Sequence, residues 1–398
     1  MDLQWLKPVL GRPAPFTTVY LDSTAADTAG GTDSLDRWRS LRRELEEQGA
    51  PVSVMEDIGE LVAQPTGVAG AHGRVIIADS EGVVIDRILA DAPAQSQATL
   101  GPVPVLLSAA QAGDESTRFL LVEVDRQGAD LSWSDWSGLK VAESDVVEGD
   151  HDVLHKVREG GTAQRRMETR AHDSWERNAQ AIAAELDKQV SERSPELVLL
   201  TGDIRAVGLV RDALGQHARE RLVVVPGGSR ADGVNKEAFQ ANVAEALRTH
   251  RDQRRQQVLE QYRTGRGRGE GAVTALADVV DVLRRGQVQE LLFDTTARMD
   301  GSTLREARLW IGPEPLELAV TQEELESMGA QGGAGLVPAD VALVRAAVAQ
   351  DAGLTFVEDG AVELMDGVGA VLRWSDGSTP SVSVPSQSAD TGRLRGAV

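Results

Sequence analysis

The stretch GGTAQRRMETRAHDSWERNAQAIAAELDKQV, residues 160–190, decides how this chain is read. Apolar side chains recur three and four positions apart for more than six turns, which predicts a long amphipathic helix. They are Met167, Ala171, Trp175, Ala179, Ile182, Leu186 and Val190. Pro195 ends the helix. The glycine pair before it predicts a tight turn with an exposed backbone.

Strand-like segments on both sides predict that this helix covers a mixed sheet. FLLVEVDRQGADLSW, residues 119–133, has two apolar runs around a Gln-Gly turn and predicts a hairpin. LVLLT at 197–201 and LVVVP at 222–226 flank a helix over 207–214, and this βαβ pattern favours parallel pairing. We therefore predict a middle α/β domain over residues 115–264.

Similar patterns predict two further αβ domains. In residues 1–114, a strand at PFTTVYLD and a helix at 35–45 precede a hairpin formed by RVIIAD and GVVIDRI. Residues 271–375 read as a helix over 273–283, a strand over 288–293 and a closing GVGAVLRW. Residues 376–398 have little to bury and are expected to be disordered. The predicted fold class is α/β, with three domains that each hold a mixed sheet and packed helices.

Composition excludes several classes of function. The 398-residue chain has no cysteine, which rules out disulfides, thiolate metal sites and cysteine nucleophiles and suits a reducing interior. No apolar run approaches the roughly 20 residues needed to cross a bilayer, and no leader pattern opens the chain. We therefore expect a cytoplasmic protein with no membrane contact and no cofactor.

The net charge of −21 argues against a nucleic-acid partner, but the charge is uneven. Residues 1–114 hold 8 basic and 16 acidic residues (−8), and residues 271–398 hold 9 and 19 (−10). The remaining 24 basic and 27 acidic residues give the middle only −3. A basic cluster surrounds the glycine pair, at Lys156, Arg158, Arg165, Arg166 and Arg170. This local charge leaves an RNA partner open, although solvated helix faces are the simpler interpretation, and no feature points to DNA.

Gly160, Gly161 and Gln164 form the most informative local motif. The glycines free backbone N–H groups, and the amide of Gln164 both donates and accepts hydrogen bonds beside two arginines. These groups suit the positioning of a water or a scissile bond near an RNA end. From the local sequence alone, a glycine turn that opens a helix is the simpler reading.

Other motifs predict structure more than chemistry. His151 and His155 are four apart, but no third ligand stands at metal spacing, so we predict no metal site. The stretch TGRGRGEG, residues 264–271, lacks phosphate-loop features and predicts an interdomain linker. Residues 227–230, Gly-Gly-Ser-Arg, follow a strand and are better explained as a turn than as an anion site.

The order of these signals resembles the bacterial branch of the archaeo-eukaryotic class-one release factor and Pelota superfamily. The resemblance spans about residues 1–375, through the hairpin at 119–133, the glycine pair with its Arg-rich helix, and the closing strand at 367–374. The opening of the chain and its first helix look more narrowly like a group of actinobacterial proteins. Release factors place Gln directly after two glycines, whereas here Thr162 and Ala163 intervene. This Gly-x-x-Gln spacing is similar to that of the Vms-type peptidyl-tRNA hydrolases.

The resemblance implies an activity, partners and residue roles. A ribosome-associated protein would enter the A site and free stalled nascent chains at the 3′ end of peptidyl-tRNA. Gln164 would be catalytic, Gly160 and Gly161 would shape the loop, and the basic cluster at 156–170 would contact RNA. A translational GTPase is a further candidate partner. The sequence leaves open whether an ester or a phosphodiester is cleaved.

Balon-like hibernation factors share this architecture and give the alternative, a non-catalytic protein that occupies the A site under stress. Gln164 favours hydrolysis, whereas the absence of a strict Gly-Gly-Gln favours occupancy. Residues 1–114 show no stop-codon motif, so termination is the weakest of the three roles. A metabolic αβ enzyme would need a cofactor loop that the sequence does not show.

Overall fold

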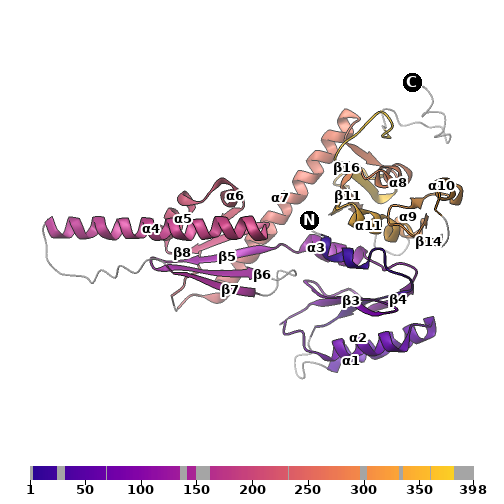
Figure 1. Ribbon diagram of the computed structural model, residues 1–398, viewed down its shortest axis with the longest axis horizontal. Coiled ribbons are helices and arrows are strands. Elements are labelled where there is room, and N and C mark those ends of the chain that lie inside the picture. The colour runs from indigo at the N-terminus through magenta and orange to yellow at the C-terminus, as the bar shows by residue number, and fades with distance from the viewer. Residues whose placement is uncertain are drawn as a thin grey trace. The chain divides into compact units, whose positions relative to one another are not determined.

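The computed structural model describes residues 3–24, 32–68, 70–134, 141–148, 162–231, 233–295, 303–330, 335–358 and 360–380 (Figure 1). The predicted α/β class is confirmed, because sheets and helices alternate along the chain. Residues 115–254 form one compact unit, the middle unit. Residues 1–114 and 255–398 together form the other.

The middle unit is built on a five-stranded mixed sheet in the order β7-β6-β5-β8-β9. Its strands are β5 (Phe119–Val124), β6 (Gly128–Ser134), β7 (Val141–Glu148), β8 (Leu197–Gly202) and β9 (Leu222–Val224). The predicted hairpin is β5–β6, which is antiparallel, and β5, β8 and β9 run parallel as expected. Neighbouring parallel strands must be joined by a long crossover connection, and here the crossovers contain helices.

Helices cover both faces of this sheet. They are α4 (Thr162–Arg193), α5 (Ile204–Ala213), α6 (Gln216–Arg219) and α7 (Lys236–Arg268). The apolar stripe of α4 from Ala179 to Val190 packs with α5 and α6 on one face of the sheet. Phe239 and Leu247, from the first half of α7, pack on the other face. Both faces are therefore apolar, which explains the continuous apolar run of β8.

The first region of the other unit departs from the prediction of a mixed sheet, because its four strands are all antiparallel, in the order β3-β2-β1-β4. The elements are η1 (Gln4–Val9), β1 (Phe16–Asp22), α1 (Thr32–Gln48), α2 (Val52–Ala63), β2 (Gly73–Asp79), β3 (Gly82–Leu89), β4 (Gln97–Gly101) and α3 (Leu107–Glu115). Two helices instead of one separate β1 from β2. The chain therefore enters β2 at the end where β1 finished, and the two strands run in opposite directions.

The last region holds a mixed sheet, β10-β16-β11-β15, and a small antiparallel sheet, β13-β12-β14. The strands are β10 (Ala272–Thr274), β11 (Val288–Asp294), β12 (Arg308–Ile311), β13 (Leu318–Ala319), β14 (Gly335–Pro338), β15 (Gly353–Val357) and β16 (Val368–Leu372). The helices are α8 (Leu276–Arg284), α9 (Thr303–Glu306), α10 (Gln322–Ser327), α11 (Ala339–Ala349) and the short η3 (Met365–Gly367). The helix predicted from residue 273 begins at Leu276, because Ala272–Thr274 pairs with β16 instead.

One hydrophobic core joins the first region to the last. It includes Leu6 and Leu106 from the first and Val280, Phe293 and Leu343 from the last, all fully buried. Lys7 also forms an ion pair with Asp351 at 2.6 Å. The regions on either side of the middle unit therefore share one interior, whereas the sequence pattern assigned each its own domain.

The glycine-rich linker prediction is wrong for residues 264–268, which form the last turn of α7. Gly265 is buried there, and a Cβ at this position would lie 2.8 Å from the Cβ of Ala272. The glycine thus permits close packing of α7 on β10.

The start of the predicted disordered tail is also corrected. Residues 376–379 form a hydrogen-bonded turn, and Arg285 Nη1 donates to the Ser378 carbonyl at 2.7 Å. The predicted tail from residue 381 lies outside the described residues. Within the described ranges, no helix is both long and apolar enough to cross a membrane.

Candidate functional site

The carboxyl ends of β5, β8 and β9 meet at one edge of the middle sheet, because these strands are parallel. Asp125 and Arg126 follow β5 directly, and Asp203 and Arg205 follow β8. Arg230 comes from the turn after β9. Ligand sites of open α/β sheets collect at this edge.

Gly202 sets the path of the chain into this edge. Its φ of +129° is a backbone conformation that only glycine adopts without strain. A Cβ added here would lie 1.9 Å from the Val124 carbonyl oxygen. The next residue, Asp203, donates its N–H to that same oxygen at 3.0 Å. Asp203 then caps α5 by accepting from the N–H groups of Arg205 at 3.0 Å and Ala206 at 3.2 Å. Gly202 thus sets the backbone path into α5 and, with it, the position of Arg205 in the first turn of that helix.

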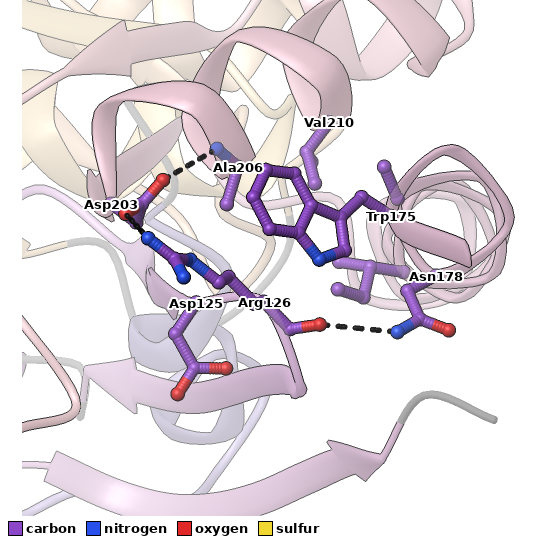
Figure 2. A pocket seen from close by; sticks show the side chains of 9 residues that line it. Asp125, Arg126, Trp175, Asn178, Asp203, Ala206 and Val210 are labelled. Carbon is purple, nitrogen blue, oxygen red and sulfur yellow. Dashed lines mark hydrogen bonds and ion pairs between the residues drawn. The ribbon is translucent and has the colours of Figure 1, made fainter. Parts of the chain in front are cut away.

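Trp175 of α4 lies at this edge, close to Arg126 and to the capping Asp203 (Figure 2), and two arginines approach its ring. The guanidinium carbon of Arg126 is 4.8 Å from the centre of the indole, and that of Arg205 is 4.3 Å away. Both distances are those of cation–π contacts. Asn178 adds a hydrogen bond from Nδ2 to the Arg126 carbonyl at 3.1 Å. We call Arg126, Trp175 and Arg205 the Arg–Trp cluster.

Carboxylates at this edge are neutralised by internal partners. Arg230 donates to Asp125 at 2.8 Å and pairs with Asp130 at 3.0 Å, so the turn predicted at 227–230 fastens the β5–β6 turn. Asp203 is 3.9 Å from Arg126, a loose ion pair. Within the described part of the chain, no carboxylate pairs with Arg205. Arg205 is therefore the guanidinium group at this edge whose charge no described carboxylate partner offsets.

Two carboxyl groups beneath the cluster have opposite pKa shifts. Burial tends to raise the pKa of Asp125, but hydrogen bonds from the Gln127 and Gly128 N–H groups and from Arg230 outweigh it, and the pKa is lowered. The pKa of Glu123 is raised by burial and by the nearby charge of Asp130. Asp125 is therefore held as an anion, and ionisation of Glu123 is disfavoured.

Helix α4 continues beyond the cluster as an arm. Residues 162–174 precede Trp175, and we call them the arm. Among the residues of α4 whose side chains are described, 175–193, the first buried one is Asn178. Figure 1 shows this part of α4 extending past the edge of its sheet. At 1.5 Å per residue the arm is about 20 Å long. The sheet thus carries a projecting helix whose N-terminal end lies far from the core.

The structure places only part of the predicted site. Gly160, Gly161, Lys156 and Arg158, and the pair His151 and His155, lie outside the described residues. Gln164, Arg165, Arg166 and Arg170 lie in the arm, where the helical backbone is described but the side chains are not. Gln164 is the third residue of α4, so it stands in the first helical turn, where we expected a loop. The roles of these residues remain predictions.

Comparison with known proteins identifies the middle region. Residues 118–268 match bacterial archaeo-eukaryotic release factor family 2. This match confirms, for the middle region, the resemblance to the bacterial branch of the release-factor superfamily described from the sequence.

Relatives extend the similarity along the chain. The proteins named "Uncharacterized protein Rv2629" and "Uncharacterized protein MT2704", from two strains of Mycobacterium tuberculosis, are each 25% identical over 378 residues. Each match covers 94% of this chain and 96% of the relative. Among solved structures, Archaeoglobus fulgidus Pelota has a TM-score of 0.31 and 11% identity and covers 94% of this chain and 92% of its own. Saccharomyces cerevisiae Dom34, titled a translation termination-like factor, has a TM-score of 0.39 and 11% identity, with coverage of 78% and 84%.

Sequence reasoning missed Arg126 and Arg205 as candidate functional residues and treated Trp175 only as part of an apolar stripe. The signal that could have found them is a repeated pattern at strand ends. Both parallel strands are followed by an aspartate and then, within two residues, an arginine. Because the carboxyl ends of neighbouring parallel strands meet, this repetition predicts two arginines at one edge.

Proposed function

We propose that this protein is a ribosome-associated, release-factor-like translation factor that frees stalled nascent chains. Its middle unit would enter the A site and carry the end of α4 to the 3′ end of the peptidyl-tRNA. The family match of residues 118–268 supports a role in translation. The arm is the observation that carries the proposal, because Gln164 lies in its first helical turn and α4 extends past the edge of the sheet.

The end of the arm suits an RNA-rich, anionic surrounding. The N-terminus of an α-helix carries unpaired N–H groups and a partial positive charge. Arg165, Arg166 and Arg170 add three cations to the arm, against Glu168 and Asp173. This local excess of positive charge favours approach to phosphates despite the net charge of the whole chain.

In the proposed reaction the amide of Gln164 orients a water molecule at the ester carbonyl of the peptidyl-tRNA. The water oxygen bonds to the carbonyl carbon, the ester C–O bond breaks, and the 3′ oxygen of the ribose takes up a proton. A fixed amide dipole can position the nucleophile and stabilise the charge that develops. The remaining groups of the site would come from RNA.

The test measures peptide release from purified stalled ribosomes with wild-type protein, Gln164→Ala and Gln180→Ala. Gln180 is an exposed glutamine farther along the same helix and is the matched control. We expect Gln164→Ala to lose release and Gln180→Ala to retain it. Equal release by both variants would refute the role of Gln164. A shortened tRNA, together with a released peptide that still carries 3′-terminal nucleotides, would instead show phosphodiester cleavage.

The position of Gln164 within a regular helix also favours a second function. A protein that blocks the A site under stress needs the reach of the arm but no catalytic amide. This hibernation role predicts co-sedimentation with ribosomes from stressed cells, with the same occupancy for Gln164→Ala and wild type. Absence of the protein from those fractions would exclude it.

A further inference from the structure

We infer that the Arg–Trp cluster is a second RNA contact, in which Arg126 and Arg205 bind phosphates of the strand whose end lies at Gln164. This inference rests on the proposed function and names a partner surface at the base of the arm. The resemblance assigned RNA contacts only to residues of the 156–170 segment. The cluster lies outside that segment, where α4 meets the edge of the sheet.

The geometry pre-orients both guanidinium groups. Each stacks near the indole of Trp175, which limits its rotation while leaving its N–H edges available to an acceptor. Both arginines are exposed, and the side chain of Arg126 is 62% accessible. Side chains held in the binding conformation lose less entropy when they bind. Two such arginines therefore suit phosphate oxygens, which a planar guanidinium can bind in bidentate fashion.

Arg205 is the cation of the cluster best placed for an anionic partner. Within the described part of the chain no carboxylate pairs with it, whereas Arg126 keeps a loose ion pair with Asp203 at 3.9 Å, and Asp125 and Asp130 share Arg230. Ile204, which is 91% exposed, adds an apolar surface beside Arg205. Unstacked nucleobases commonly rest on apolar side chains or guanidinium planes. Phosphate contacts with an adjacent apolar surface match single-stranded RNA better than an acidic peptide.

The spacing relates the cluster to the proposed reaction centre. Gln164 and Trp175 are eleven positions apart on one helix, about 16 Å. A stacked strand rises about 3.4 Å per nucleotide, so this distance spans about five nucleotides. An RNA strand that ends at Gln164 and follows the arm would therefore bring its phosphates to the cluster.

The test measures the salt dependence of binding by the full-length protein to two probes, purified ribosomes and a twelve-nucleotide oligocytidylate RNA. Three variants are compared with wild type. They are the double substitution Arg126→Gln/Arg205→Gln, the loss of the apolar side chain in Ile204→Ser, and the control Arg211→Gln. Arg211 is exposed on α5 and pairs with its neighbour Asp212 at 3.1 Å. Unchanged circular dichroism would verify that each variant is folded.

Loss of two single-strand phosphate contacts should reduce the slope of log affinity against log salt by about 1.4. The affinity deficit of the double variant would then be about sevenfold larger at 50 mM than at 200 mM salt. Ile204→Ser should weaken binding without changing the slope, and Arg211→Gln should change neither. A wild-type slope in the double variant, or an equal effect of Arg211→Gln, would overturn the inference.

The two probes separate this inference from the proposed function. Cluster-dependent binding of the oligonucleotide without ribosome binding would overturn the proposed function and support the RNA contact. Ribosome binding that does not depend on Arg126 and Arg205 would overturn only the inferred RNA contact at the Arg–Trp cluster. If the oligonucleotide does not bind and ribosome binding shows an unchanged slope, the cluster has a structural role alone.

Discussion

Substitution of Gly202 by alanine tests whether the edge of the middle sheet is built as described. At φ +129° an L-residue is strained by about 1–3 kcal/mol. The new Cβ would also stand 1.9 Å from the Val124 carbonyl oxygen, so the backbone must shift by more than 1 Å to reach ordinary contact. Overpacking of this kind adds about 1–3 kcal/mol. Together, Gly202→Ala should destabilise the middle unit by about 2–6 kcal/mol.

Gly208→Ala is the matched control, six residues away in α5. A Cβ there would meet nothing within 4 Å, and alanine in a helix interior is more stable than glycine by about 0.5–1 kcal/mol. One glycine substitution should therefore destabilise the middle unit and the other should stabilise it. The contrast removes any general effect of adding a methyl group.

Urea denaturation, followed by hydrogen exchange in peptides from β5 and β8, measures both effects on the middle unit itself. With a slope of about 2 kcal/mol per molar urea, the middle of the usual range, Gly202→Ala should lower the midpoint by about 1–3 M. Gly208→Ala should raise it slightly. A loss below about 1 kcal/mol for Gly202→Ala would mean that β8 does not end as described, and the reasoning would fail.

Two further predictions concern single groups. The raised pKa of Glu123 means that its contribution to stability is present below the usual glutamate value of 4.5 and is lost as pH rises through the higher folded value. Glu123→Gln cannot ionise and so avoids this loss. The free energy of unfolding of the variant minus that of the wild type should therefore rise with pH across this range. Urea titrations in which that difference falls as pH rises would contradict the prediction. Tyr20→Phe removes a buried hydroxyl that donates to the Val105 carbonyl at 2.7 Å and accepts from the Ala109 N–H at 3.1 Å. It should destabilise the other unit by about 1–3 kcal/mol in thermal unfolding, and an unchanged melting temperature would show that neither bond matters.

The elements predicted best from the sequence are those whose own side chains decide their structure. The α4 stripe and the β5–β6 hairpin follow from local spacing. The hairpin is confirmed, and so is the stripe from Ala179 to Val190. The glycine-rich end of α7 was misread because composition does not distinguish a flexible glycine from one that allows close packing. Gly265 leaves space for Ala272, a contact between chain segments that composition does not encode.

The Arg–Trp cluster could not be derived from local pattern because its members lie at 126, 175 and 205. Only the parallel pairing of β5 with β8 brings Arg126 near Arg205, and only the packing of α4 adds Trp175. The glycine pair and Gln164 were visible at once because they are contiguous. The sequence alone was therefore enough to single out the glycine pair and Gln164 as candidates, whereas the structure was needed to find the Arg–Trp cluster at the base of the arm.

The shared core of the first and last regions has a consequence for synthesis. The fully buried Leu106 finds partners such as Phe293 only after the whole middle unit has left the ribosome. About 258 residues separate residue 114 from the end of β16, which at about 5–20 residues per second is about 13–50 s of elongation. During that time the first sheet carries an uncovered apolar face. We expect nascent chains truncated before β11 to require a chaperone, whereas the middle unit can fold as it emerges.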